Sequence, residues 1–436
     1  MNFKHNIELI DETLREGSER SPYNVDSETK VKLAQKILNT GVKSLVVGMF
    51  PDVPENIDLL KELLVLQKNG KIDQEKRFII ISHLGKRFTE TTQIIEDLGI
   101  ESSSVWILAI HGCSDKQIKY LFPKIYNESN SSKINTSEWM DLDDNQRREV
   151  NLKWFEEFIK DNKSKNGSRV MLGLLDYFRA DLDLIDYFLS VAVSNNISQV
   201  RLVDSAGTCR PDQLNSYVGK KVEKFSMLKF YGHFHNDFGL ASANALLGLS
   251  MGLQGVDVSL GGFANRAGHP TLAEIAYGLK KLYQVELPYF KYENLYHLSR
   301  DVEQTYGLIE SPTTPITGVI TSTTTTGIRT ELEKICPDIF DISKASEVGS
   351  KVFKTLGIRS GLDGLKRFAK EKKIEIDEVE FSKVYEQLMD SWTRRSEKRK
   401  ETSLMLINQY QENLAASLYT EEEILESLKN FKGKIS

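Results

Sequence analysis

Short apolar runs alternate with amphipathic segments of helical length over the first 285 residues. Eight runs are almost continuously apolar and end in polar residues, which is typical of strands buried on both faces; they cover 7–11, 42–48, 77–82, 104–110, 170–176, 199–204, 228–235 and 255–260. Helical periodicity follows each run, in segments 26–41, 54–70, 91–99, 151–162, 181–196, 211–225, 238–252 and 271–285. Several of these segments begin after Asp, Ser or Pro and end with Gly or Asn, which are helix start and stop signals.

Eight strand–helix units in succession predict an α/β fold, a TIM (β/α)8 barrel. The same alternation also permits an open doubly wound sheet, but the count of eight favours the barrel. The connection at 112–150 is unusually long, with a middle rich in Asn and Ser. We interpret it as a mobile surface insertion, and a lid over the active end is the alternative.

The pattern changes after residue 285. Residues 286–344 contain a Pro- and Thr-rich stretch with little periodicity, whereas 345–436 have helical patterns and a charged tail. We therefore expect a metal-dependent catalytic barrel at 1–285, a linker at 286–344 and a mainly helical C-terminal subdomain at 345–436. The basic residues of 393–401 stand among glutamates without interleaved aromatics, which indicates a solvated helix face.

The amino-acid composition argues against several classes of protein. With 40% hydrophobic and 27% charged residues, the chain has the make-up of a globular protein. A net charge of -5 argues against nucleic acid as a partner, and no apolar run is long enough to cross a membrane. Three widely spaced cysteines do not form a disulfide framework, so we expect a cytoplasmic location.

In a barrel the active site forms at the C-terminal ends of the strands. Five of the seven histidines follow predicted strands and are expected to meet at this rim. The candidate residues, in chain order, are Asp11, Arg15, Glu16, His83, His111, Asp176, Arg179, Asp204, Ser205, His233, His235 and His269.

The step from His233 to His235 is the sharpest signal. Residues two apart on a strand share a face, so both imidazoles point the same way. Two imidazoles and one carboxylate, from Glu16 or Asp11, form a common transition-metal site. An HxH step alone is more often incidental, but its position at a strand end before Asn236 favours metal binding.

Arg15 has two interpretations. It is either a surface salt-bridge partner or a guanidinium that stabilises negative charge on a metal-bound carbonyl group. The chain has no Gly-rich phosphate loop and no GxSxG motif. A metal with an arginine therefore indicates carbonyl chemistry rather than phosphoryl transfer or serine hydrolysis.

Four segments resemble the DRE-TIM metallolyase superfamily, which includes isopropylmalate, citramalate and homocitrate synthases, HMG-CoA lyase and some aldolases. They are DETLREG (11–17), LVDSAGTCRP (202–211), GHFHNDFGLASANALLGLSMG (232–252) and GVDVSLGGFANRAGH (255–269). Residues 356–389 are similar to the second subdomain of the synthases, so the synthase branch is the closer likeness.

The resemblance implies a divalent cation, Mg, Mn or Zn, held by Glu16, His233 and His235. His269 replaces an Asn that is often a further ligand, which favours a softer metal than Mg. A 2-oxo acid would bind the metal, with Arg15 on its keto group and Ser205 on its carboxylate. Acetyl-CoA or another acyl-CoA would be the co-substrate, and the protein would be a homodimer.

We also expect Asp176 and Arg179 to be catalytic and His83 and His111 to contact substrate, although hydrogen-bonded rim residues are an equal alternative for the two histidines. The chain departs from the family at acidic barrel positions, now Val46 and Leu175.

The linker histidine of the synthases aligns with Thr324, and two nearby histidines align with Arg329 and Arg359. Three functions follow: a divergent acyltransferase performing a Claisen-type condensation, a metal-dependent lyase or aldolase using His83, His111 or His269 as base, or a non-catalytic metal-binding paralogue.

Overall fold

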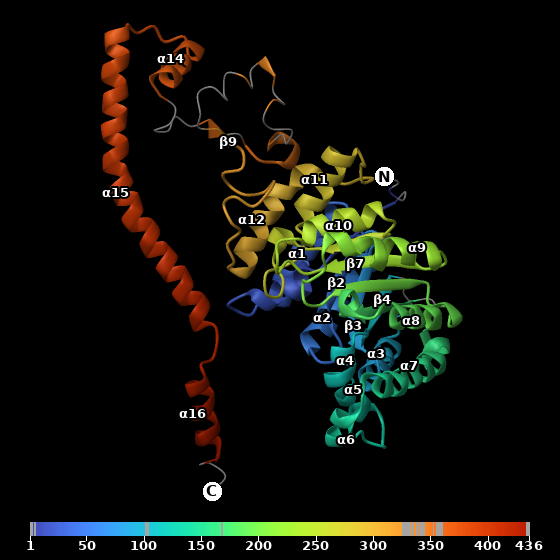
Figure 1. Ribbon diagram of the computed structural model, residues 1–436. Helices are drawn as coiled ribbons and strands as arrows, with labels where there is room; N and C mark the ends of the chain where they lie inside the picture. Colours follow the sequence, from blue (N-terminus) through green and yellow to red (C-terminus); the bar gives the residue numbers. More distant parts are fainter. Residues whose placement is uncertain are drawn as a thin grey trace.

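Eight parallel strands close into a barrel in chain order in the computed structural model (Figure 1). The structure describes residues 3, 6–100, 104–166, 169–324, 332, 335–336, 339, 345–351, 353–354 and 361–432. The strands are β1 (Glu8–Asp11), β2 (Ser44–Met49), β3 (Arg77–His83), β4 (Val105–Gly112), β5 (Val170–Leu175), β6 (Gln199–Asp204), β7 (Lys229–Phe234) and β8 (Gly255–Val258). Ile10 pairs with Asp257, so β1 and β8 close the barrel. The predicted barrel is confirmed, and the open sheet is excluded.

Both faces of the strands are buried, which explains their continuous apolar character. Inward residues fill the barrel with one apolar cluster that includes Val46, Ile81 and Ile110. Their neighbours in sequence, such as Val47 and Ala109, pack instead in the larger core beneath the helices. Each polar residue at an inward position therefore stands out, because it must be satisfied inside the barrel.

Helices cover the outside of the barrel (Figure 1). They are α1 (Ser27–Asn39), α2 (Pro54–Lys68), α3 (Lys86–Asp97), α7 (Asp144–Asn166), α8 (Leu182–Ser194), α9 (Lys220–Lys224), α10 (Ala241–Ser250) and α11 (Leu272–Tyr283). Capping side chains begin several of them; Asp26, for example, accepts a hydrogen bond from Thr29 N, and Thr271 accepts one from Glu274 N. The predicted helix at 211–225 is broken into a 3-10 turn, a π-helical turn and the short α9.

The insertion after β4 is helical, which its polar composition did not indicate, and its interpretation as a mobile surface insertion stays a prediction. It contains α4 (Asp115–Tyr120), α5 (Phe122–Ser129) and α6 (Thr136–Asp141) before α7 begins. Phe122 and Trp139 are buried and give this segment an aromatic core. The start of α3 contacts α5, because Lys86 N donates to Ser129 Oγ at 2.9 Å. The insertion thus lies beside the rim at β3.

After the barrel, α12 (Leu295–Tyr306) packs back onto it, and Tyr306 donates a hydrogen bond to Thr13 O at 3.0 Å. The strands β9 (Thr323–Thr324) and β10 (Phe353–Lys354) pair with each other. The C-terminal region is helical as predicted, with α14 (Gly361–Glu371), α15 (Glu378–Ala416) and α16 (Glu421–Lys432). The division at residues 285 and 344 stays a prediction.

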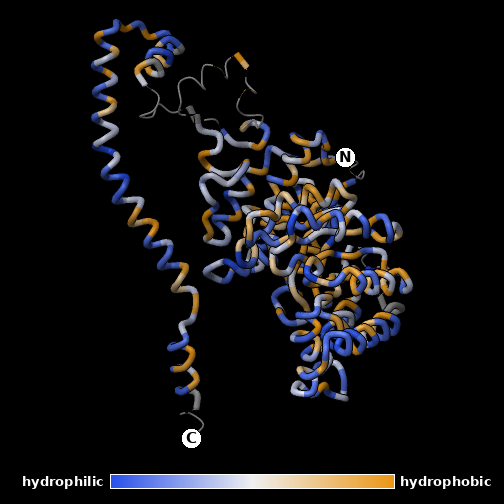
Figure 2. Tube along the Cα trace, in the orientation of Figure 1, coloured by the Kyte–Doolittle hydropathy of each residue, from blue (hydrophilic) through white to orange (hydrophobic). Residues whose placement is uncertain are grey.

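The 39-residue α15 runs along the molecule with little cover (Figure 1). Near its end, Ile309 N donates to Tyr410 Oη at 3.0 Å, and Leu414 packs against the main core. Apolar and polar residues alternate along the helix (Figure 2). No helix within the described residues has both the length and the apolar character needed to cross a membrane.

Candidate metal centre

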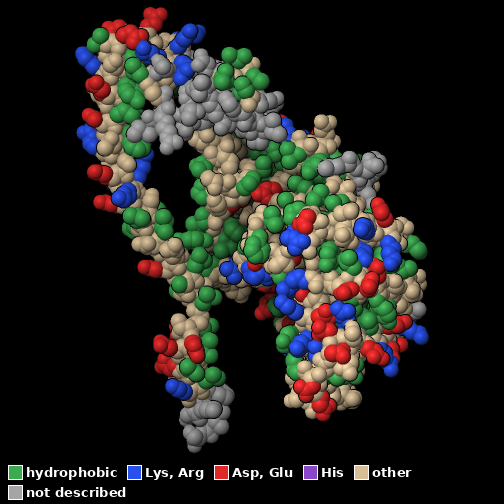
Figure 3. All heavy atoms as spheres, viewed as in Figure 1, with side chains coloured by type: hydrophobic (Ala, Val, Ile, Leu, Met, Phe, Trp, Pro, Cys, Tyr) green, Lys and Arg blue, Asp and Glu red, His purple; other side chains and the backbone are tan. Residues whose placement is uncertain are grey.

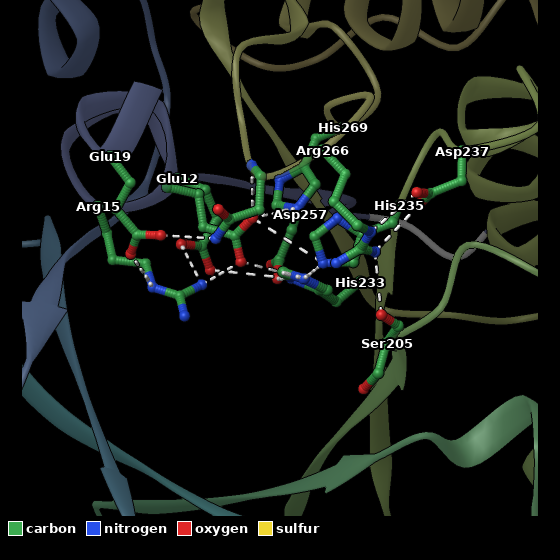
Figure 4. A network of polar contacts seen from close by, with 12 residues as sticks. Glu12, Arg15, Glu19, Ser205, His233, His235, Asp237, Asp257, Arg266 and His269 are labelled. Carbon is green, nitrogen blue, oxygen red and sulfur yellow. Dashed lines mark hydrogen bonds and ion pairs between the residues drawn. The ribbon is translucent and has the colours of Figure 1, made fainter. Parts of the chain in front are cut away.

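Four buried side chains converge at the C-terminal end of the barrel (Figure 4). Glu16 belongs to the π-helical turn Thr13–Gly17 that follows β1. His233 lies in β7, His235 lies just beyond that strand, and His269 lies in the loop after β8. One ligand atom from each of the four falls within 4.8 Å of the others. The structure therefore brings together all four residues predicted to bind metal.

The contacts in this cluster are those of converging ligands. Glu16 Oε2 lies 3.0 Å from His269 Nε2, and Glu16 Oε1 lies 3.6 Å from His233 Nε2. Among the described residues, however, His269 Nε2 has no hydrogen-bond partner of acceptable geometry. A buried nitrogen that approaches a carboxylate without bonding to it is suited to share a cation with it. Three imidazoles and a carboxylate fit a divalent transition metal.

Electrostatics favour the ligand form of three of these four groups. Burial opposes ionisation of Glu16, but interactions with His269, Arg15 and His233 hold the pKa of its carboxyl well below the usual range. Burial lowers the pKa of His233, and burial with the neighbouring imidazoles lowers the pKa of His235 to about 2. Burial also opposes a charge on His269, but the Glu16 carboxylate raises the pKa of that imidazole, so a metal would replace a proton there.

Asp11, the alternative carboxylate ligand, is instead hydrogen-bonded to Thr13. Its two oxygens accept hydrogen bonds from Thr13 N at 2.9 Å and Thr13 Oγ1 at 3.1 Å. They fix the turn that carries Glu16. Burial raises the pKa of Asp11 to about 7, although the bonds from Thr13 act in the other direction. The carboxylate that faces the histidines is therefore that of Glu16.

A second layer of charge surrounds His233 and was not predicted. His233 Nδ1 lies 2.6 Å from Asp257 Oδ2, and Arg201 Nη1 lies 3.1 Å from Asp257 Oδ2 and 3.2 Å from Glu12 Oε1. All of these side chains are buried. Burial raises the pKa of Glu12 to about 8, with Arg15 acting against it. Charged residues inside the apolar runs 199–204 and 255–260 were the signal for this layer.

Arg15 stands beside the cluster and is partly exposed. Its Nη1 contacts Glu16, and its Nη2 lies 3.8 Å from Met49 Sδ, a weak acceptor. Its buried Nε lies 3.8 Å from Glu19 Oε1, and its Nη1 lies 3.7 Å from Glu12 Oε2. Arg15 thus retains Nη2 as a donor for an additional anionic or carbonyl group.

Ser205, Asp176 and Arg179 form a connected group at the ends of β5 and β6. Asp176 N donates to Ser205 Oγ at 2.9 Å, and Arg179 Nε donates to Asp176 Oδ1 at 2.7 Å. Ser114 donates to the other oxygen of Asp176. Arg266 Nη2 donates to Ser205 O at 2.9 Å and links this residue to the loop of His269 (Figure 4). Asp176 is thus already engaged by protein donors on both carboxylate oxygens.

The two histidines predicted to contact substrate at the rim, His83 and His111, point in different directions. His111 points away from the barrel into the helical layer, where it contacts the rings of Trp154 and Phe155 and the side chain of Asn151. The expected substrate contact of His111 is therefore corrected, because Ile110 takes the inward position. His83 shares the inward face with Ile81, and burial lowers the pKa of His83 to about 4.

The structure also places Val46 and Leu175, which stand where the family has acidic residues. Val46 is buried in the interior cluster, and Leu175 packs against it. The barrel is therefore apolar at these two positions. Arg329 and Arg359 lie outside the described residues.

Known proteins resemble this chain over most of its length. A family model described as HMGL-like matches residues 6–302. The chain is 28% identical over 385 residues to 2-isopropylmalate synthase of Sulfurisphaera tokodaii, covering 88% of this chain and 90% of the relative. It is 23% identical over 398 residues to homocitrate synthase AksA of Methanothermobacter thermautotrophicus, covering 89% and 90%. The HMG-CoA lyase structure from Bacillus subtilis aligns with a TM-score of 0.54 at 16% identity, over 73% of this chain and 99% of that one, and shows a shared fold.

Proposed function

The chain belongs to the HMGL-like family, and from that premise we propose that it is a metal-dependent acyltransferase that condenses an acyl-CoA, acetyl-CoA in the first instance, with a 2-oxo acid. The balanced reaction takes up water and forms one C–C bond: acetyl-CoA, 2-oxo acid and water give a 2-substituted malate, free CoA and a proton. The single observation that carries the proposal is the buried cluster of Glu16 with three histidines beside Arg15.

Glu16, His233, His235 and His269 would hold the cation. When bound, a divalent metal supplies Lewis-acid polarisation of the oxygens of a 2-oxo acid. Zn, Mn or Fe suits three imidazole donors better than Mg does. The resemblance included Mg, and we propose the softer metals because His269 adds a third nitrogen to the set.

Arg15 would stabilise the negative charge that develops on the keto oxygen. Its Nη2 has spare donor capacity, and its position beside Glu16 places it at the edge of the cluster. A guanidinium already fixed by Glu16 needs little reorganisation as that charge appears. Ser205 accepts a hydrogen bond from Asp176 N, so its hydroxyl proton is available to donate to the carboxylate of the substrate.

His83 is our candidate for the proton-transfer group. It lies on the inward face at the end of β3, and its Nδ1 has no hydrogen-bond partner among the described residues. Because burial lowers its pKa to about 4, the imidazole is neutral near pH 7 and able to accept a proton. It is a weak base, so we expect slower turnover than from a group with a pKa near neutrality.

A metal-dependent lyase or aldolase acting through an enolate is the second candidate. Apolar Val46 and Leu175 at the acidic positions of the family favour it, because they leave fewer groups for acyl-CoA activation. A non-catalytic paralogue would keep the metal and lack turnover on every substrate.

Thiol release distinguishes these functions. The full chain, loaded in turn with Zn, Mn or Mg, is mixed with acetyl-CoA and a panel of 2-oxo acids, and free CoA is measured with a thiol reagent. We expect release that requires both substrates, and none from Glu16→Gln, which keeps the shape of the side chain. Cleavage of 3-hydroxy acids without CoA release would identify the lyase, and metal binding without any turnover would identify the paralogue.

We further propose that the protein is a homodimer through its C-terminal helices. Large apolar side chains of α15 are exposed, among them Leu404, Met405, Leu406 and Ile407, each at least half exposed (Figure 3). A second copy would cover them, and light scattering during size exclusion checks the mass. A cytoplasmic location fits three cysteines that are all unpaired.

A further inference from the structure

The two ring nitrogens of His233 face different groups. Its Nε2 is 3.6 Å from Glu16 Oε1 and 3.3 Å from His235 Nε2, within the candidate metal cluster. Its Nδ1 is 2.6 Å from Asp257 Oδ2, on the neighbouring strand β8. A neutral imidazole carries one N–H, and the partner of that N–H decides which nitrogen remains free to bind a metal.

Asp257 is itself held by a buried arginine. Arg201 lies on β6, where Arg201 pairs with Tyr231 and Val203 pairs with His233. The guanidinium therefore sits one inward layer deeper in the barrel than the metal cluster. Its Nη1 contacts Asp257 Oδ2 at 3.1 Å and Glu12 Oε1 at 3.2 Å. One guanidinium thus contacts two buried acidic side chains.

The carboxylates of Glu12 and Asp257 also resemble a second metal site, but their contacts with Arg201 argue against one. Ligand atoms of Glu12, His233 and Asp257 lie within 4.8 Å of one another, close enough for one ion. The Nη1 of Arg201 already touches both carboxylates, so the positive charge that this position needs is supplied by the protein. One metal ion among the described residues of each chain is the consequence.

We infer that Asp257 is a positioning residue for the metal centre and that Arg201 holds it in place. Asp257 accepts the N–H at Nδ1 of His233, which leaves Nε2 unprotonated and directed at Glu16, His235 and His269. Such outer partners of metal-binding histidines fix the tautomer and the ring orientation. This inference rests on the proposed function only in requiring that the cluster binds a metal.

Glu12 provides a matched control. It is fully buried and contacts the same Nη1 of Arg201, but its Oε1 is 3.9 Å from His233 Nδ1, beyond hydrogen-bond distance. Asp257→Asn and Glu12→Gln each replace an acidic group that contacts the same guanidinium with an amide of the same size. Only Asp257→Asn changes the group that faces His233.

The test is titration of the full metal-free chain with Co²⁺, followed by its visible absorption. We expect one equivalent in the wild type, a loss of affinity of about 10- to 100-fold with an altered spectrum for Asp257→Asn, and a change of less than about threefold for Glu12→Gln. Equal weakening in both variants would show a general effect of altering the partners of Arg201 and would overturn the inference. Unchanged binding in Asp257→Asn, or two equivalents in the wild type, would overturn it as well.

A measurement on the wild type covers the case in which Asp257→Asn does not fold. Nitrogen NMR of metal-free protein with labelled histidine reads the tautomer of His233 directly. A proton on Nδ1 is expected, and a proton on Nε2 overturns the inference. Failure of the wild type to bind Co²⁺ while His233 keeps the Nδ1 proton would instead contradict the metal centre on which the proposed function depends.

Discussion

Replacing His111 with leucine should flatten the dependence of folding stability on pH. His111 is buried among Trp154, Phe155 and two further rings, and burial lowers its pKa to about 4. The unfolded chain has an ordinary histidine pKa of about 6.5, so between these values it binds a proton that the folded chain does not. Stability contributed by a neutral His111 is therefore present above about pH 6.5 and is lost as the pH falls towards 4.

The magnitude follows from the shift. At about 1.4 kcal/mol per pH unit, the full loss is ~3 kcal/mol below pH 4, and ~2 kcal/mol of it has developed at about pH 5. His111→Leu removes this loss. Near pH 7.5 it should cost only about 1 kcal/mol, because the contact with the Asn151 side chain disappears while apolar packing is retained.

The assay is urea unfolding of the metal-free protein at about pH 7.5 and about pH 5, since metal ligands would otherwise add their own proton uptake. Asn151→Leu is the control, because it removes the same contact and keeps the titrating imidazole. We expect the wild-type slope with pH in Asn151→Leu and a slope reduced by ~2 kcal/mol in His111→Leu. An unchanged slope in His111→Leu would refute the placement of a neutral imidazole in the helical layer.

Three further substitutions probe the site and the turn that carries it. Asp11→Asn should remove a pH dependence of opposite sign: burial raises the pKa of Asp11 to about 7, so the contribution of Asp11 to wild-type stability is lost as the pH rises from about 4 to 7, and a variant whose pH slope in urea unfolding equals that of the wild type would contradict this. His269→Ala should weaken Zn²⁺ binding by at least ~100-fold in calorimetric titration, since loss of an outer partner alone costs about 10- to 100-fold; wild-type affinity would exclude His269 as a ligand. Arg15→Gln should lower kcat for CoA release by about 100- to 1,000-fold while Zn²⁺ still binds, and a normal kcat would return Arg15 to a surface salt bridge.

The barrel was predictable because its strands are buried on both faces. Each of the eight apolar runs became a strand, and their bounds differ from the prediction by a few residues at most. Because both faces are buried, however, the sequence does not indicate which residues of a strand point into the barrel and which point towards the helices. In the run 104–110 no polar alternation distinguishes inward from outward positions, so His111 was placed at the mouth although Ile110 faces inward.

Within the site, the spacing of residues identified candidate metal ligands on a regular strand, but it did not decide between candidates whose positions depend on turns. His233 and His235 were predicted from their spacing together with their position at a strand end, because residues two apart on a strand share a face. The pattern alone left Asp11 and Glu16 as alternatives; the family resemblance favoured Glu16, and the π-helical turn after β1 gives the two residues different contacts. Arg201 and Asp257 were overlooked inside apolar runs, where a charged residue indicates a partner within the barrel.

The helices of the 112–150 insertion were missed for a different reason. Its Asn- and Ser-rich composition is typical of a loop, whereas a few apolar residues, Phe122 and Trp139 among them, supply enough contact to order it. Sparse apolar anchors at irregular spacing do not produce a periodic signal, and tertiary packing then overrides composition.

The central claim is that a C–C bond forms between an acyl-CoA and a 2-oxo acid at the Glu16, His233, His235 and His269 centre. Mass spectrometry of the products from acetyl-CoA labelled with ¹³C in its methyl group tests this most directly. The account predicts a labelled 2-substituted malate from the metal-loaded wild type with its preferred 2-oxo acid, its disappearance on metal chelation and its absence in Glu16→Gln. Equal labelled product from Glu16→Gln, or no labelled product from a metal-loaded wild type across the whole 2-oxo acid panel, would contradict it.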